Sequence, residues 1–145
     1  MEEILDRIFP ILRGMYKYIV IDLGHWLDAL FIQVCAEADM VLMLTQFTIP
    51  DIKNLEILLP MLLDHHLDTH KIKIIVNRHI RHHVVQLGDL DHIIKHPAFH
   101  TLPSDYFSLM KAIDLGTTLA NVAPRSKLLS SIKQLGTLIL KEIGN

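Results

Sequence analysis

Apolar residues along the chain alternate between short continuous runs and longer stretches with helical spacing. Three runs are rich in Val, Ile and Leu: "YIVIDL" (18–23), "DMVLMLT" (39–45) and "KIKIIVN" (71–77); a fourth and weaker run is "AFHTLP" (98–103). Because most of these runs do not alternate between apolar and polar residues, they are typical of parallel strands that are covered on both faces. The pattern therefore predicts four strands.

The stretches around these runs carry apolar residues three and four positions apart, which predicts helices. They are expected over residues 2–13, 26–38, 48–67, 86–95, 104–115 and 124–143. Pro60 is expected to kink or split the third of them. Strands that alternate with helices imply right-handed crossovers. We therefore predict an α/β fold of three layers, α/β/α, with a mostly parallel sheet of about four strands in one domain, residues 1–145.

Ligands bind such folds outside the carboxyl ends of the strands, so the residues that follow each run are the candidates for chemistry. A charged side chain at the end of a buried run needs water, a metal or a ligand within reach. The candidates are Asp22 and Gly24, Thr45 and Gln46, Asn77 and Arg78, and Pro103, Ser104 and Asp105.

Composition narrows the class of protein. Half of the 145 residues are hydrophobic and 21% are charged, which suits one globular domain with a sizeable core. The net charge of −2 with ten neutral histidines gives no basic field for nucleic acid. The single cysteine, Cys35, fits a reducing compartment, and no apolar run reaches the ~18 residues of a membrane span. We expect a cytoplasmic protein.

Five stretches resemble, in this order, the MinD/ParA-type deviant Walker ATPases: "YKYIVIDLGHWLDA", "ADMVLMLTQFTIPDIKN", "IIVNRH", "TLPSDYFSLMKAIDLG" and "APRSKL". The nearest resemblance is to the CpaE/TadZ branch, which is associated with the assembly of Flp-type (tight adherence) pili. It covers nearly the whole chain. It implies a P-loop NTPase fold, ATP and Mg²⁺ as the cofactors of the family, and partners in pilus and secretion machinery.

The sequence departs from this family in one major feature. The Gly-rich phosphate loop that ends in Gly-Lys-Ser or Gly-Lys-Thr has no counterpart, and the first glycine, Gly14, lies in "LRGMYK". The pattern therefore indicates the carboxyl-terminal portion of such a protein, a partial fold without its first strand. For this chain alone we expect no bound cofactor and no ATP turnover, although the family it resembles is one of ATPases.

The resemblance assigns roles to the first candidates. Asp22 matches the Walker B-type aspartate, which would hold Mg²⁺ indirectly, through water. Its alternative role is to cap the following helix through backbone N–H groups. Gly24 and His25 occupy the switch-like turn of the family, and we interpret His25 as a surface histidine.

The resemblance places the nucleotide base at two later strand ends. Asn77 and Arg78 match the "NR" that ends a strand in the family, and an Asn amide offers the donors and the acceptor that suit an adenine edge. Pro103 and Asp105 lie at the neighbouring strand end and would shape the base pocket. In the alternative, Asn77 bonds loop backbone and Asp105 caps the helix that starts near Ser104.

Histidines form a separate candidate system. "HHLDTH" (65–70) and "RHIRHH" (78–83) flank the third run and are expected at its opposite ends. A metal-dependent hydrolase built on them is the third functional alternative. It lacks support because metal ligands must converge, and the sequence has neither an HExxH motif nor a second cysteine.

The function that this pattern favours is a non-catalytic assembly or localisation module of a CpaE/TadZ-like pilus system, at the inner face of the cytoplasmic membrane or the cell pole. The alternative is the nucleotide-binding half of a working ATPase whose P-loop lies outside this chain. Self-association is expected, since a fold without its first strand uncovers a sheet edge. The last helix is expected to pack in the core, on the sheet, or in a dimer; peripheral membrane binding is its alternative.

Overall fold

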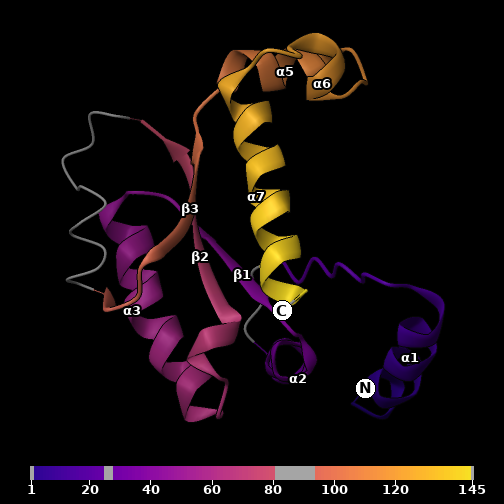
Figure 1. Cartoon of the computed structure of the whole chain (residues 1–145). Coiled ribbons are helices and arrows are strands. Elements are labelled where there is room, and N and C mark those ends of the chain that lie inside the picture. Colours follow the sequence, from indigo (N-terminus) through magenta and orange to yellow (C-terminus); the bar gives the residue numbers. More distant parts are fainter. Residues whose placement is uncertain (1, 25–27, 81–93, 145) are drawn as a thin grey trace.

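The computed structural model describes residues 2–24, 28–80 and 94–144 of the chain (Figure 1). The elements, in chain order, are α1 (Glu2–Met15), α2 (Ala29–Glu37), β1 (Val41–Thr45), α3 (Ile49–Asp64), a 3₁₀ turn (Thr69–Lys71), β2 (Ile72–His79), β3 (Ala98–Pro103), α5 (Tyr106–Asp114), α6 (Leu119–Val122) and α7 (Lys127–Ile143). The helix predicted over 86–95 falls almost entirely outside the described residues.

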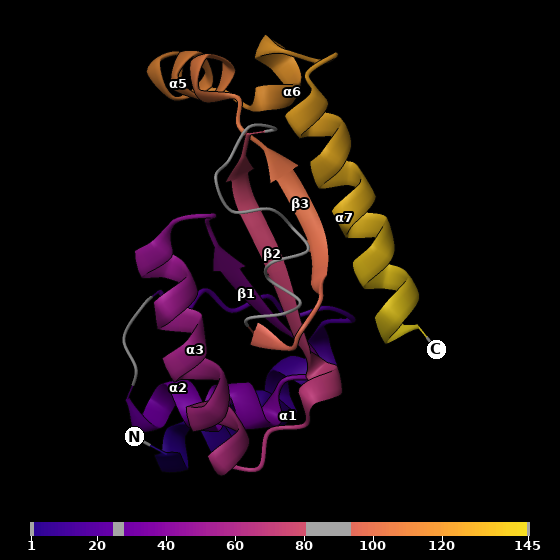
Figure 2. The ribbon, with the colours of Figure 1, turned by 90° about the vertical axis from the view of Figure 1, so that its left-hand side faces the viewer.

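Within the described ranges the sheet has three strands in the order β1-β2-β3, and all of them are parallel. The ladder between β1 and β2 runs without a break from Val41 opposite Ile72 to Thr45 opposite Val76. The ladder between β2 and β3 shifts register twice, after Ile74 and after Val76. Figures 1 and 2 show α3 on one face of the sheet and α7 on the other. The predicted α/β class and parallel sheet are confirmed.

The central strand β2 is buried on both faces, which explains its unbroken apolar run. Ile72, Ile74 and Val76 join the larger core cluster under α3, together with residues such as Leu55 and Leu62. Ile75 points to the other face, where it packs in a second cluster with two residues of β3 and α7, Leu102 and Leu128. Both helical layers are therefore fixed to the same strand.

The edge strand β1 is covered on one face only. Met43 and Thr45 are buried, whereas Leu42 and Leu44 on the opposite face are exposed. The helix on that side of the sheet, α7, packs against β3 at the other edge. Among the elements that the structure describes, no helix packs on the side chains of β1 that point away from α3.

The strand predicted over residues 18–23 is wrong. These residues form no strand and are mostly exposed, with Val20 at 95%. In Figures 1 and 2 the segment follows α1 as an irregular trace that does not join the sheet. A strand needs a neighbouring backbone to pair its N–H and C=O groups, and β-branched composition alone does not supply one. The described sheet therefore has three strands, where about four were expected.

Helix ends follow the capping residues. Thr48 accepts a hydrogen bond from the backbone N–H of Asp51 at the start of α3 (3.3 Å), and Ser126 accepts one from Leu129 at the start of α7 (2.9 Å). Pro60 lies inside α3, which continues to Asp64, so the expected split does not occur. None of the helices within the described residues has the length and apolar character needed to cross a bilayer.

A buried hydroxyl ties α7 to β3. Ser131 of α7 donates to the backbone oxygen of Thr101 (2.8 Å), and the ring Nε2 of His100 lies 2.9 Å from the Ser131 Oγ and 3.0 Å from its backbone oxygen. Because the hydroxyl hydrogen is committed to Thr101, Nε2 must be the donor in both contacts. The imidazole therefore carries its hydrogen on Nε2, facing α7.

This contact predicts a stability difference between two adjacent serines. Ser131→Ala should lower the free energy of unfolding by about 1–3 kcal/mol, because the carbonyl of Thr101 loses its donor in a part-buried position. Ser130→Ala is the matched control on the exposed side of α7 and should change stability by less than about 0.5 kcal/mol. Urea denaturation followed by circular dichroism measures both, and equal losses would refute the assigned role.

Candidate functional site

The carboxyl ends of β2 and β3 meet at one rim of the sheet. His79 is the register partner of Pro103, and the backbone N–H of Ser104 donates to the backbone oxygen of His79 (3.1 Å). The structure thus brings the two predicted pairs, Asn77 with Arg78 and Pro103 with Asp105, to the same end of neighbouring strands. We call this end the strand-end rim.

Asn77 uses its side chain to hold its own turn. Its Oδ1 accepts a hydrogen bond from the backbone N–H of Arg78 (2.9 Å). Arg78 has φ +51°, a left-handed conformation that costs a residue with a Cβ on the order of 1 kcal/mol. The side-chain bond offsets part of that cost. The side chain of Asn77 therefore stabilises the turn at Arg78, at the position where the family resemblance suggests an adenine contact.

Asp105 has a local partner as well. It precedes α5, and its Oδ1 accepts a hydrogen bond from the backbone N–H of Ser108 (3.3 Å). This is an N-cap, in which a carboxylate satisfies donors of the first helical turn and faces the positive end of the helix dipole. Pro103 is the last residue of β3 and precedes this cap by two positions.

Asp22 lies in the exposed segment that follows α1. Its Oδ1 accepts a hydrogen bond from the backbone N–H of Gly24 (3.0 Å), and Gly24 has φ +64°, which favours glycine. Because residues 18–23 form no strand, the sheet does not carry Asp22 to the strand-end rim with Asn77 and Pro103. His25 lies outside the described residues.

The helix cap that the sequence suggested for Asp22 belongs to Asp28. The side chain of Asp28 accepts from the backbone N–H of Phe31 (2.9 Å) at the start of α2. The signal was available in the sequence, because an Asp directly before a helical apolar pattern is a common N-cap. The structure thus uses two carboxylates in this region, Asp22 for the turn and Asp28 for the helix.

The described histidines do not form a metal centre. His70 lies in the turn before β2 and His79 at the end of that strand, so they are at opposite ends of it, as predicted. Among the residues that the structure describes, no group of three or more His, Cys, Asp and Glu side chains could hold a metal ion. His82 and His83 lie outside those residues.

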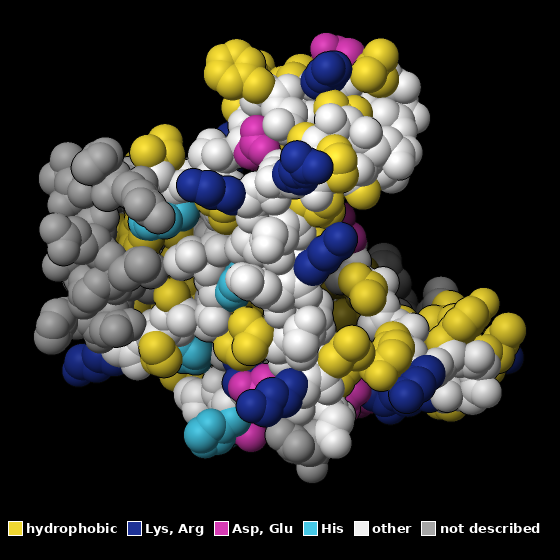
Figure 3. Space-filling view, turned by 45° about the horizontal axis from the view of Figure 1, so that its top comes forward, with side chains coloured by type: hydrophobic (Ala, Val, Ile, Leu, Met, Phe, Trp, Pro, Cys, Tyr) yellow, Lys and Arg dark blue, Asp and Glu magenta, His cyan; other side chains and the backbone are white. Residues whose placement is uncertain are grey.

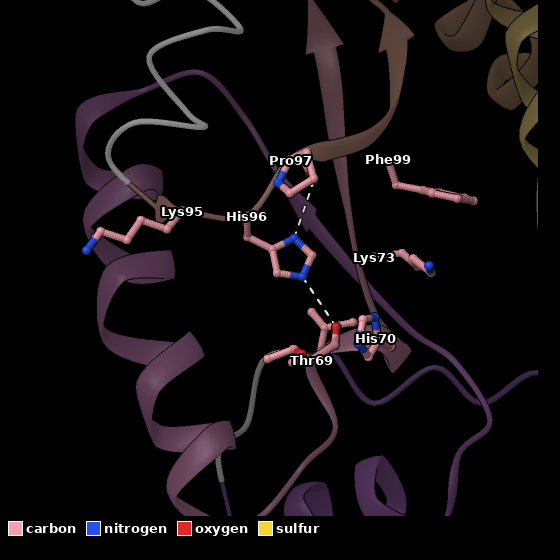
Figure 4. A pocket seen from close by; sticks show the side chains of 8 residues that line it. Thr69, His70, Lys73, Lys95, His96, Pro97 and Phe99 are labelled. Carbon is pink, nitrogen blue, oxygen red and sulfur yellow. Dashed lines mark hydrogen bonds between the residues drawn. The ribbon is translucent and has the colours of Figure 1, made fainter.

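A cavity of about 380 Å³ opens at the amino ends of β2 and β3, opposite the strand-end rim (Figure 4). His96 lies across it, with Nε2 3.4 Å from the backbone oxygen of Thr69 and Nδ1 3.4 Å from that of Pro97. Lys73 sits over the ring of Phe99 and pairs with Glu142 of α7 (3.1 Å). The cavity thus has a basic lining and lies at the end of the sheet where the fold does not place ligands.

The single thiol is structural in character. Cys35 is buried in α2 and belongs to the core cluster under α3. Burial raises the pKa of the Cys35 thiol above its ordinary value, which keeps it protonated and unreactive at neutral pH.

Comparison with known proteins establishes the fold. No protein family model matches the sequence, and no curated protein matches it. The crystal structure of a ParA family ATPase from Chlorobium tepidum TLS superposes with a TM-score of 0.82 at 22% sequence identity and covers 91% of this chain. The chain spans 55% of the length of that structure. This chain therefore shares with that structure an α/β fold with parallel strands.

The cap at Asp105 can be separated from any ligand role by two substitutions. Asp105→Ala should lower the free energy of unfolding by about 1 kcal/mol, because α5 loses a side-chain acceptor at its first turn. Asp105→Asn should retain most of the stability, since an amide oxygen caps almost as well. Thermal and urea unfolding measure both. An unchanged stability for Asp105→Ala would show that the carboxylate is not a cap.

Proposed function

We propose that this chain is a non-catalytic assembly or localisation module of a CpaE/TadZ-like pilus system. The observation that carries the proposal is the hydrogen bonding of the three polar candidates. Asp22, Asn77 and Asp105 each accept a hydrogen bond from a backbone N–H within three residues of themselves. Their side chains thus support two turns and the start of a helix.

The chemistry of phosphate transfer supports the same proposal. A triphosphate needs a loop of backbone N–H groups and a lysine, and Mg²⁺ draws several of its ligands from the phosphates themselves. The sequence contains no Gly-Lys-Ser or Gly-Lys-Thr. A fold alone does not confer catalysis when the residues of the catalytic site are missing. A fold like that of the ParA family ATPase, without this phosphate-binding motif, therefore supports a scaffold role. The order of the five sequence motifs supports the CpaE/TadZ branch.

Such a module acts through its surface, and α5 offers one candidate contact with the pilus and secretion machinery. Phe107 is 86% exposed, and Tyr106 beside it is exposed too, with the two rings edge to face at 5.7 Å. Figure 3 shows exposed hydrophobic side chains over this end of the molecule. Exposed aromatic side chains are the residues that most often anchor protein partners. Self-association is the second contact that we propose, and the inner face of the cytoplasmic membrane or the pole is the proposed location.

The non-catalytic part of the proposal predicts no ATP turnover. The purified chain with Mg²⁺ and ATP should release phosphate at the rate of a protein-free blank, because the sequence has no Gly-Lys-Ser or Gly-Lys-Thr loop to hold the phosphates. Asp22→Ala should leave that rate unchanged. A magnesium-dependent rate that Asp22→Ala abolishes would contradict the proposal and restore the Walker B role of Asp22.

The assembly part predicts a specific partner contact. The chain should bind the secretion ATPase of the pilus system in a purified two-component assay, such as biolayer interferometry. Phe107→Lys should weaken that binding by about tenfold or more, the effect of losing a central aromatic anchor. Ile57→Lys is the matched control, since Ile57 is 70% exposed on α3. Equal effects of both substitutions, or no binding at all, would count against α5 as the contact.

One observation favours the nucleotide-binding half as a second candidate. Asn77 and Pro103 do share the strand-end rim, where the family resemblance suggests the base pocket. If this candidate is correct, calorimetry should detect ATP binding to the chain that Asn77→Ala abolishes. The same titration with adenosine tests the base contact without the phosphates.

A further inference from the structure

The cavity at the amino ends of β2 and β3 has a one-sided charge, and we call it the basic cavity. Four of the eight residues that line it are Lys or His and none is Asp or Glu, although the chain as a whole has a net charge of −2. The basic residues are His70, Lys73, Lys95 and His96. The volume of about 380 Å³ lies within the range of small-molecule sites, which is ~300–1,000 Å³.

His96 is the central side chain of the basic cavity. Figure 4 shows its ring between Pro97 and Thr69, with Lys73 and Phe99 on one side. Each ring nitrogen lies 3.4 Å from a backbone oxygen, Nε2 from that of Thr69 and Nδ1 from that of Pro97. These distances exceed the usual ~2.7–3.2 Å of an N–H···O bond, so the acceptor is held weakly whichever nitrogen carries the hydrogen. The ring can therefore give this hydrogen bond to a ligand oxygen at small cost.

Lys73 supplies a positive charge whose present partner is replaceable. Its ammonium nitrogen lies 3.1 Å from Oε1 of Glu142 and 5.3 Å from the centre of the Phe99 ring. The side chain of Lys73 is 20% exposed, whereas that of Glu142 is 45% exposed and is not part of the cavity lining. An ion pair with such a solvated carboxylate contributes little to stability. An anion inside the cavity can thus take the place of Glu142 while the fold stays intact.

We propose that the basic cavity binds a small organic anion, a phosphate monoester or carboxylate with an apolar body. The oxygens of the anion accept hydrogen bonds from Lys73 and His96, and bonds of this charge-assisted kind are among the stronger ones in proteins. The apolar body rests on Ile72 and Phe99, which line the same cavity. Lys95 is directed away from His96 (Figure 4), so it adds charge only at a distance. The site is independent of the pilus role proposed above, because neither α5 nor the strand-end rim contributes to it.

The charges around the basic cavity favour a small soluble anion over the phosphates of a membrane or a nucleic acid. Extended polyanions are bound by broad basic faces. Here two carboxylates adjoin the cavity. Glu142 pairs with Lys73, and Asp68 accepts a hydrogen bond from the backbone N–H of His70 (2.9 Å). The positive charge is therefore confined to the cavity, where only a ligand small enough to enter can reach it.

The test is an NMR titration of the full 145-residue chain with phenyl phosphate, followed through the backbone amide signals. We expect saturable binding with a dissociation constant in the millimolar range or tighter, and the largest shifts at His70, Lys73 and His96. Inorganic phosphate should bind more weakly because it lacks an apolar body. Phenol should produce no saturable shift because it lacks the anionic group.

Three substitutions separate the site from general attraction of anions. Lys73→Gln should weaken binding of phenyl phosphate by about tenfold, the effect of losing one charge-assisted hydrogen bond. Glu142→Gln should strengthen it by about threefold, because Lys73 loses its competing carboxylate. Lys133→Gln is the matched control on the exposed side of α7 and should leave the affinity unchanged. Circular dichroism and thermal melting confirm that every variant folds.

Each other outcome overturns the inference in a distinguishable way. Phenyl phosphate that causes no saturable shift removes the site. Equal weakening by Lys73→Gln and Lys133→Gln, or no gain from Glu142→Gln, indicates an adventitious anion only. Shifts with phenol as large as those with phenyl phosphate indicate an apolar cavity that does not recognise charge. A chain that ignores phenyl phosphate but floats with phosphatidylglycerol vesicles, and loses them on Lys73→Gln, assigns these charges to a membrane surface.

Discussion

The burial of β2 on both faces is the constraint from which the rest of the structure follows. Ile74, Ile75 and Val76 are fully buried although they point alternately to opposite faces of the sheet. Each fully buried Ile or Val contributes roughly 1.5–3 kcal/mol relative to an exposed one. A strand with this pattern must be central and must be covered by a layer on each side. The positions of α3 and α7, and the parallel neighbours β1 and β3, are consequences of that requirement.

The same constraint determines which surfaces remain uncovered. The helix α7 packs on β3 and is fixed there by Ser131, whose hydroxyl bonds the backbone of Thr101. It therefore covers Ile75 and Leu102 but leaves the outer face of β1 open, with Leu42 and Leu44 exposed. The open face of β1 and the strand-end rim thus arise from one arrangement, in which α7 covers β3 and part of β2, and β2 and β3 end side by side.

The local sequence correctly predicted the strands that pair with another strand in the described sheet. The run at 98–103 became β3 with the predicted bounds, and the run at 71–77 became β2, because both find a partner strand and an apolar layer. The run at 18–23 has more β-branched residues than the run at 98–103, yet it forms no strand. Pairing is a property of two backbones, which no periodicity in one segment can reveal. The register shifts after Ile74 and Val76 were likewise invisible in the sequence.

The polar candidates show why a fold of known type does not specify its chemistry. The groups that bind phosphate in such folds are backbone N–H donors at turns and helix starts, and they attract any acceptor. At Asp105 the acceptor of such a donor is the protein's own carboxylate, which bonds the N–H of Ser108. At Asn77 the amide oxygen accepts the N–H of Arg78. The residue types that suggest a ligand from sequence are thus the same types that satisfy the backbone in its absence, and only the partners distinguish the two roles.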